Sequence, residues 1–201
     1  MAGGREKVHF QVHFGAEYHT GKYGWTMDLE TIKRSVDWQL KALGTDYIDF
    51  GFVHCIDELS DLEKAVAGGI LEYIRQLQKA GTVKHIGLSS HTPAVVEKAL
   101  DLGFPEMVMF SINPAYDYRH GEYAIGGVDE RAALYRRCEA EGVGISVMKP
   151  FSGGQLLRDK TSPFGHKLTQ YQCLQYALDK PGVVTVLPGV KDREDLKGIL
   201  G

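Results

Sequence analysis

Alternation of short apolar segments with longer amphipathic segments is the feature that most limits what this chain can fold into. Period-two alternation predicts strands over 5–15, 47–53, 82–89, 107–113, 142–148 and 183–187. Spacing of three or four residues predicts helices over 29–43, 61–80, 93–102, 129–141, 168–178 and 192–200. Strands that alternate with helices across short connections predict a parallel sheet with right-handed crossovers.

Two parallel α/β architectures compete for this pattern. A doubly wound sheet usually carries G-x-G-x-x-G after its first strand, whereas Gly15 is followed here by AEYHTG. Six βα units therefore predict most of a (β/α)8 barrel, which normally needs about 250 residues. We expect residues 1–201 to form one such partial barrel domain.

Composition excludes several classes of protein. The chain has 201 residues, a net charge of −3 and 43% hydrophobic residues, as expected of a globular protein. Neither an apolar run long enough to span a membrane nor an amino-terminal signal peptide is present, so no membrane partner is expected. No basic patch interleaved with aromatic residues points to nucleic acid. Three separated cysteines, Cys55, Cys138 and Cys173, form no metal-binding spacing and predict a cytoplasmic location.

Two strands end on a histidine. The stretch LGTDYIDFGFVHCID (Leu43–Asp57) predicts a helix end, a stop at Gly44 and a strand that delivers His54 to its carboxyl end. His13 lies near the end of the first strand, on its polar face. Because barrels place chemistry at the carboxyl ends of their strands, both side chains are expected to open to the same cavity. The alternative is that each is a structural histidine satisfied by a backbone carbonyl.

Residues 16–26 contain two glycines and three aromatic residues between the first strand and the first helix. This composition predicts a loop, and its position predicts a lid over the strand ends.

Four blocks of this sequence resemble the aldo-keto reductase superfamily in order and spacing. They are LGTDYIDFGFVHCID, GTVKHIGLSSH (Gly81–His91), GISVMKPFSGGQLL (Gly144–Leu157) and PGVVTVLPGVKDREDL (Pro181–Leu196). The resemblance is nearest to a bacterial branch whose members often carry a carboxyl-terminal four-iron cluster domain, and no iron–sulfur cluster is expected in this chain. Matched in this way, the first strand corresponds to the third strand of the family barrel, so we expect the chain to lack the first two βα units.

The resemblance implies reduction of a small carbonyl compound by NADH or NADPH, or the reverse oxidation of an alcohol. The family's catalytic Tyr and Asp belong to the two upstream units and have no counterpart here. The family His falls on His54, and the family Lys falls on His13, so these two are the implied catalytic residues. His13 could replace the lysine only when protonated, because a neutral imidazole has no charge to stabilise a tyrosinate.

The resemblance also implies a set of cofactor-binding residues and no metal ligands. The nicotinamide positions of the family fall on Ser89, Ser90, Asn113 and Met148. The pyrophosphate loop falls on Lys149, Pro150, Phe151, Gly153 and Gly154. The phosphate-binding end falls on Gly189, Lys191 and Arg193. Glycine permits close backbone approach to a phosphate, and a helix start offers N–H groups. Asp195 replaces the arginine that pairs with a 2′-phosphate, which favours NAD over NADP, although Lys191 or Arg193 could compensate.

Two other functions stay open. The altered lysine and the missing tyrosine favour a scaffold that binds a nucleotide or a partner without turnover. Alternatively, His13, His54 and His91 could hold zinc in a metal-dependent hydrolase or isomerase, although His91 starts a loop and is expected to be solvated. Two open sheet edges make a homo-oligomer the expected assembly.

Overall fold

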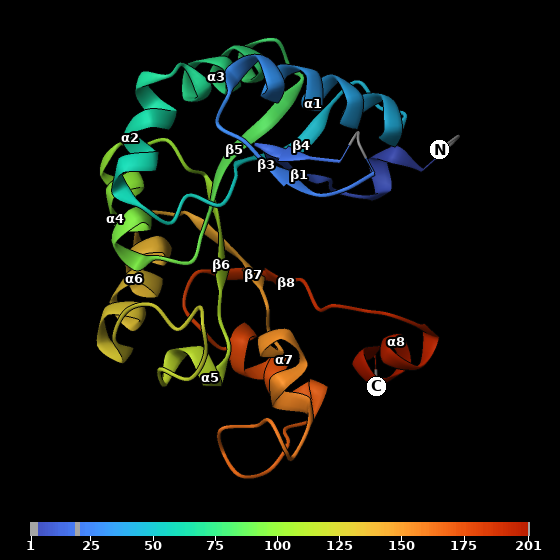
Figure 1. Cartoon of the computed structure of the whole chain (residues 1–201), viewed down its shortest axis with the longest axis vertical. Helices are drawn as coiled ribbons and strands as arrows, with labels where there is room; N and C mark the ends of the chain where they lie inside the picture. Colours follow the sequence, from blue (N-terminus) through green and yellow to red (C-terminus); the bar gives the residue numbers. More distant parts are fainter. Residues whose placement is uncertain (1–3, 19–20, 201) are drawn as a thin grey trace. The chain divides into compact units, whose positions relative to one another are not determined.

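The computed structural model describes residues 4–18 and 21–200, which pack as two compact units. The first unit comprises the chain up to residue 90 together with 94–108, and the second comprises 91–93 together with the chain from residue 109 onward (Figure 1). No helix within the described residues combines the length and the apolar character that crossing a membrane requires.

Six strands form one sheet in the order β1-β4-β5-β6-β7-β8. They are β1 (Gln11–Phe14), β4 (Ile48–Val53), β5 (Val83–Ser90), β6 (Met107–Ser111), β7 (Gly144–Met148) and β8 (Val183–Val186). The pairs β1–β4, β4–β5 and β7–β8 are parallel, with Gln11 opposite Phe50 and Ile48 opposite Val83. The predicted parallel α/β fold with six strands is therefore confirmed, and β1 and β8 are the end strands of the sheet.

Helices follow the strands at nearly the predicted places. They are α1 (Leu29–Leu43), α2 (Leu59–Ala67), α3 (Ile70–Lys79), α4 (Pro93–Asp101), α5 (Pro114–Asp117), α6 (Val128–Ala140), α7 (Gln170–Leu178) and α8 (Arg193–Leu200), with 3-10 turns η1 (Arg5–Lys7) and η2 (Ser152–Leu157). The single helix predicted over 61–80 is wrong, because Gly68 and Gly69 lie between α2 and α3 and glycine is a poor helix former. The strand predicted over 5–15 is also too long, since β1 begins only at Gln11.

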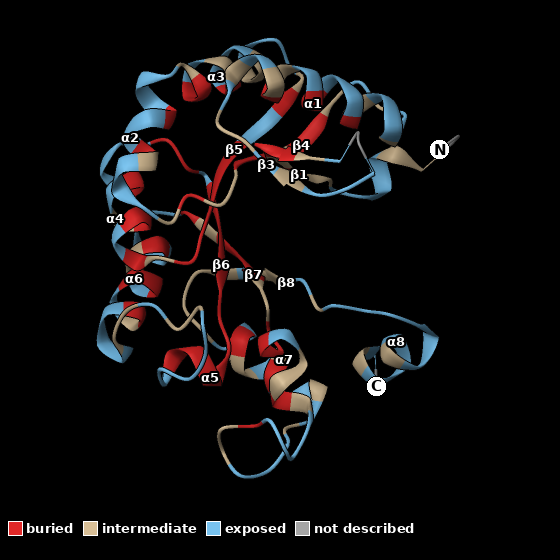
Figure 2. Ribbon diagram, in the orientation of Figure 1, coloured by how far each residue is buried: buried red, intermediate tan, exposed pale blue. Residues whose placement is uncertain are grey.

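Burial concentrates on the strands and on the helix faces that cover them (Figure 2). In the first unit α1 packs against β1 and buries Ile32 and Val36, which are each 1% exposed. Full burial of one such side chain stabilises the fold by about 1.5–3 kcal/mol. The side chain of Asp28 caps α1 by accepting a hydrogen bond from the Thr31 N–H at 2.8 Å.

The segment predicted as a lid loop contains an antiparallel hairpin instead, formed by β2 (Ala16–Glu17) and β3 (Gly24–Trp25). The Trp25 indole N–H donates to the His54 carbonyl oxygen at 3.0 Å, and the Thr26 N–H donates to the Gly15 carbonyl oxygen at 2.9 Å. The first bond holds the hairpin against the carboxyl end of β4, and the second joins its far end to Gly15, which follows β1. The predicted lid function stays a prediction.

Gly15 joins β1 to this hairpin in a conformation that favours glycine, with φ +109°. A Cβ atom there would lie 2.8 Å from the Thr26 carbonyl oxygen, which is closer than a real contact allows. We therefore expect Gly15→Ala to lower the free energy of unfolding by about 1–3 kcal/mol, measured by urea denaturation. Gly4→Ala is the control, because a Cβ at Gly4 meets no atom within 4 Å. Equal stability of the two variants would contradict the prediction.

The second unit contains a core of its own, formed by Ala115, Tyr116, Phe151, Leu156 and Cys173. α7 packs against β8, and α6 packs against β7. Phe151 ties the loop after β7 into this core and so fixes the start of the segment predicted to bind pyrophosphate.

Candidate functional site

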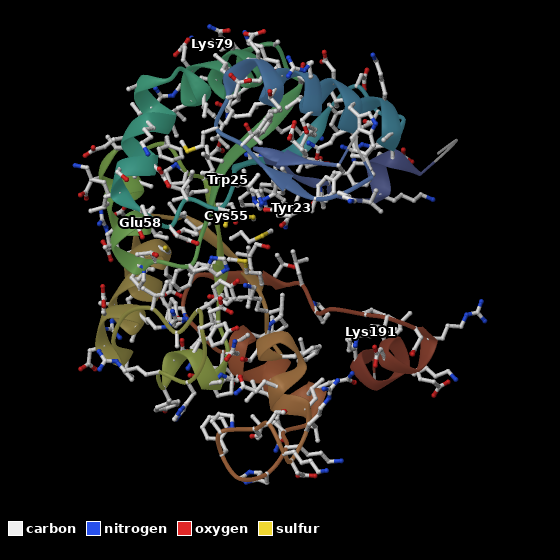
Figure 3. The ribbon with its side chains drawn as sticks, in the orientation of Figure 1. Tyr23, Trp25, Cys55, Glu58, Lys79 and Lys191 are labelled. Carbon is white, nitrogen blue, oxygen red and sulfur yellow. The ribbon has the colours of Figure 1, made fainter. Side chains whose placement is uncertain are left out.

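The first unit brings His13, His54 and Tyr23 into one line of hydrogen bonds. His54 Nδ1 lies 2.9 Å from His13 Nδ1, and His54 Nε2 lies 2.9 Å from the Tyr23 hydroxyl oxygen. His13 belongs to β1, His54 follows β4, and Tyr23 comes from the hairpin, beside Trp25 (Figure 3). The two histidines thus lie together at the strand ends, whereas their opening to one cavity and their catalytic role stay predictions.

Burial, followed by the neighbouring charge of His54, lowers the pKa of His13 from its ordinary 6.5 to about 3. The His13 ring also stacks on Phe52, with the ring centroids 5.5 Å apart. His13 is therefore a neutral imidazole at neutral pH. It has no positive charge with which to replace a catalytic lysine.

The second unit contains a cavity of about 650 Å³, within the size range of small-molecule sites. Seven of the predicted cofactor-binding residues line it: Lys149, Pro150, Phe151, Gly153, Gly154, Gly189 and Lys191. Arg158 adds a third cation, and Asp192 and Asp195 add two carboxylates. Two loops that are far apart in sequence, one after β7 and one after β8, thus meet around one cavity.

The loop after β7 turns sharply through four residues with positive φ: Lys149, Ser152, Gly153 and Gly154. A Cβ atom at either glycine would meet no atom within 4 Å, so the backbone there borders open space. A ligand phosphate can approach such a backbone closely. Glycine backbone together with Lys149, Arg158 and Lys191 is a donor set that fits the diphosphate of a dinucleotide.

The start of α8 is already capped by carboxylates of this chain. Asp192 Oδ1 accepts from the N–H groups of Glu194 and Asp195, both at 2.9 Å. Asp195 Oδ2 accepts from the Lys191 N–H at 3.1 Å. Phosphate binding by these helix N–H groups would therefore have to displace a carboxylate, and the side chain of Lys191 is the more accessible donor at this end.

The other predicted cofactor residues lie elsewhere. Ser90 is buried and its hydroxyl donates to Asp57 Oδ1 at 3.3 Å, while Ser89 is buried beside it on β5. Met148 is half-buried at the end of β7, and Arg193 is exposed on α8. None of these four is among the residues that line the cavity.

Asn113 is buried and its amide is engaged within the protein. Oδ1 accepts from the Tyr116 N–H at 2.9 Å, which caps α5, and Nδ2 donates to the Lys149 carbonyl oxygen at 2.9 Å. The second bond ties β6 to the cavity loop. Contact of Asn113 with a nicotinamide carboxamide stays a prediction.

His91 is buried, at 5% exposed, so the expectation of a solvated loop residue is wrong. Its ring stacks on Tyr123 at 4.4 Å between centroids, and its Nε2 lies 3.1 Å from Lys149 Nζ. Lys149 Nζ also lies 3.1 Å above the Tyr123 ring, in cation–π contact. The packing of Tyr123 explains this burial, which the sequence did not reveal.

Sequence reasoning missed Tyr23 and Tyr123 as neighbours of the predicted site. Tyr23 lies in a segment predicted as a loop, and Tyr123 lies between a predicted strand and a predicted helix, where no periodicity indicates which way a side chain points. The aromatic content of 16–26 was the one available signal for Tyr23.

The Aldo/keto reductase family model matches residues 7–172. The chain belongs to the aldo/keto reductase family. Among curated family members it is 22% identical to L-glyceraldehyde 3-phosphate reductase of Escherichia coli (strain K12), over 78% of the chain and 42% of that protein. It is 28% identical to the aldo-keto reductase yakc [NADP(+)] of Schizosaccharomyces pombe, over 86% of the chain and 49% of that protein. The chain thus spans about half the length of the curated relatives that it matches.

Solved aldo-keto reductases share its fold. The holo form of aldo-keto reductase AKR11C1 from Bacillus halodurans matches with a TM-score of 0.74 and 22% identity, over 98% of this chain and 68% of that one. A reductase from Pseudomonas, described as putative aldo-keto reductase PA4992, matches with a TM-score of 0.71 and 23% identity, over 98% and 68%. The six-stranded α/β fold of this aldo/keto reductase chain is therefore similar to a large part of the family barrel.

Proposed function

We propose that this chain takes part in NAD(P)H-dependent reduction of a small carbonyl compound, or in the reverse oxidation of an alcohol. The observation that carries the proposal is the cavity of the second unit. Seven residues assigned to cofactor binding from sequence line that one cavity, and two of them, Lys149 and Lys191, are joined there by a third cation, Arg158. Membership of an oxidoreductase family supports the same reaction class.

The nucleotide diphosphate is assigned to the loop after β7 and to Lys191. Lys149 is held by His91 and Tyr123, so its side chain is already oriented before a ligand binds. A bound nicotinamide would supply the hydride, and the protein would position the substrate and supply a proton. We assign His54 to hydrogen bonding with the substrate oxygen, which would have to replace the Tyr23 hydroxyl at His54 Nε2.

Fluorescence titration with NADH and with NADPH tests the nucleotide assignment directly. Binding of either nucleotide should be weakened at least tenfold by Lys191→Ala, because one phosphate contact is lost. Lys197→Ala is the matched control, since Lys197 lies on α8, pairs with Glu194 and does not line the cavity. Oxidation of the bound nucleotide by small aldehydes, followed at 340 nm, then tests turnover.

One observation favours a second function, namely nucleotide binding without turnover. His13 is neutral at neutral pH and stands where the family has a lysine, so the charge that lowers the pKa of a catalytic tyrosine is absent. Tight nucleotide binding combined with no oxidation of the reduced form by any aldehyde would favour this alternative.

We further propose that Asp195 makes NADH the preferred nucleotide. Asp195 lines the cavity, where its carboxylate would repel a 2′-phosphate by about 1 kcal/mol at partly screened distances. Asp195→Arg should therefore raise the affinity ratio of NADPH to NADH about tenfold, because arginine can pair with the phosphate. Titration of both proteins with both nucleotides measures this ratio.

Glu194→Arg is the control for that experiment. Glu194 carries the same charge in the same turn of α8, but it pairs with Lys197 and does not line the cavity. An equal shift in both variants would indicate a general charge effect, and no shift in Asp195→Arg would mean that Asp195 does not face the ribose.

We also propose a cytoplasmic location and self-association. The three cysteines are widely separated in sequence, which fits a reducing compartment. β1 and β8 end the sheet, and end strands present backbone groups that a second copy could pair with.

A further inference from the structure

The first unit contains a cavity of its own, which the proposed function does not use. Its volume is about 480 Å³, within the size range of small-molecule sites. It lies along β1, an end strand of the sheet, and beside the carboxyl half of α1. All of its lining residues belong to the first unit, so its shape does not depend on the second unit.

Aromatic and aliphatic side chains form most of the lining. Phe10, Tyr18 and Trp38 supply three rings, and Val12 and Leu43 add aliphatic groups. The side chains of Tyr18 and Trp38 are exposed, so a ligand can reach them from solvent. Among the described residues that line the cavity, none carries a charge. The lining therefore suits a flat, uncharged, aromatic ligand, which can stack on such rings.

The Gln39 side chain gives this cavity a fixed polar group. Gln39 is only 9% exposed, and its Nε2 donates to the Ser35 hydroxyl oxygen at 3.3 Å and to the His13 carbonyl oxygen at 3.5 Å. The Ser35 hydroxyl donates its own hydrogen to the Ala16 carbonyl oxygen at 2.6 Å, so toward Gln39 it acts as an acceptor. Both neighbours of Nε2 are therefore acceptors, which fixes the amide with its NH₂ group toward them.

This orientation leaves Gln39 Oε1 on the other side of the amide. Within the described residues, this oxygen accepts no hydrogen bond. It is not sealed inside the core, because Ser111 Oγ is the side-chain atom of the described residues that is both fully buried and without a partner. Since Gln39 lines the cavity, its oxygen opens there. An unsatisfied acceptor in a largely buried side chain costs free energy, which a donor on a ligand would offset.

We propose that this cavity binds a neutral aromatic compound that carries a ring N–H group, such as an indole. The ring stacks on Trp38 and Tyr18, and the ring N–H donates to Gln39 Oε1. The contact involves no nucleotide and no residue of the second unit. It is therefore a second ligand site, and its test stands whether or not the chain binds NADH or NADPH.

Titration of the nitrogen-15-labelled full chain with indole, followed by NMR, tests this site. We expect saturable binding that shifts the signals of the Gln39 amide and the Trp38 N–H. 1-Methylindole is the matched ligand, because it keeps the aromatic ring and has no N–H to donate. It should bind about tenfold more weakly, since Gln39 Oε1 then stays unsatisfied. Equal Kd values for the two ligands, or shifts that do not saturate, would overturn the proposal.

Two variants test the cavity wall. Trp38→Ala removes an exposed ring and should weaken indole binding about tenfold. Ala42→Phe places a ring in the cavity from an exposed helix position and should abolish binding. Tyr171→Ala is the control for unspecific stacking, because Tyr171 is an exposed ring on α7 that does not line the cavity. Its Kd should stay within about twofold of wild type. Unchanged affinity in Trp38→Ala, or in Ala42→Phe, would place indole elsewhere and overturn the site.

Discussion

Arg131→Leu should lower the free energy of unfolding by about 3–5 kcal/mol, because it leaves a buried carboxylate without its cationic partner. The Arg131 side chain is fully buried, and its Nε donates to Asp117 Oδ1 at 2.7 Å. Its other nitrogens donate to the carbonyl oxygens of Ile125, at 3.1 Å, and Ser111. Arg131, on α6, thereby links three other segments: β6 through Ser111, α5 through Asp117, and the loop after α5 through Ile125.

Asp117 is the centre of this network. Its Oδ1 also accepts from the Tyr135 hydroxyl at 2.7 Å, and its Oδ2 accepts from the Tyr176 hydroxyl at 2.8 Å. Burial, together with the Asp117 charge, raises the pKa of both phenols, so they remain neutral donors. Without Arg131, two neutral hydroxyls would be left to stabilise a buried negative charge.

Urea denaturation of three variants checks this prediction. Arg137→Leu is the control on the same helix, because Arg137 is 28% exposed and pairs with Glu141 one turn away, so its loss should cost less than about 1 kcal/mol. Adding Asp117→Asn to Arg131→Leu should recover 1 kcal/mol or more, since the unpaired charge disappears while an acceptor for the tyrosines remains. Similar losses in Arg131→Leu and Arg137→Leu would contradict the argument.

The sequence predicted the sheet well because two patterns are local: the alternation of side chains along a strand, and the spacing of apolar residues by three or four along a helix. His13 and His54 could be placed together from their positions at strand ends, without knowledge of any contact. The predicted helix boundaries were wrong where the low helix propensity of glycine outweighed the apolar spacing, as at Gly68 and Gly69.

Contacts that join distant segments could not be read from the sequence. Arg131 lies on the same helix face as the buried Leu134 and Cys138, but nothing in the sequence identifies Asp117, 14 residues away, as its partner. Tyr23 reaches His54 only because the hairpin folds back, and His91 is buried only because Tyr123 covers it. The loop after β7 was predicted to bind pyrophosphate from its resemblance to a family motif, and five of its residues line the cavity.

The second large effect concerns pH. His13 has a pKa of about 3 in the folded chain and about 6.5 when unfolded. Between these values the unfolded chain binds a proton that the folded chain does not, so stability must fall as pH falls below 6.5. Between pH 7 and pH 5 the loss is about 2 kcal/mol, at 1.36 kcal/mol per pH unit below 6.5.

Stability should be compared only above about pH 4.5, because protonation of the Asp49 carboxylate also lowers the stability at more acidic pH. Burial alone would raise the pKa of Asp49, but hydrogen bonds from the Phe10 N–H, Arg5 and Lys84 outweigh it and hold that pKa well below its usual range. Its contribution is present above pH 4 and is lost as pH falls further. Measurements between pH 7 and pH 5 therefore isolate the histidines.

His13→Gln should remove most of the loss between pH 7 and pH 5, because an amide in that place has no proton to bind. The group that faces His13 directly is His54, with Tyr23 beyond it. His120→Gln is the control, since His120 is exposed and should leave the wild-type pH dependence in place. The test compares the urea midpoints of the wild type, His13→Gln and His120→Gln at pH 7, 6 and 5. A wild-type chain as stable at pH 5 as at pH 7 would mean that His13 takes up its proton in the folded state, and the neutral end of the Tyr23–His54–His13 line would be lost.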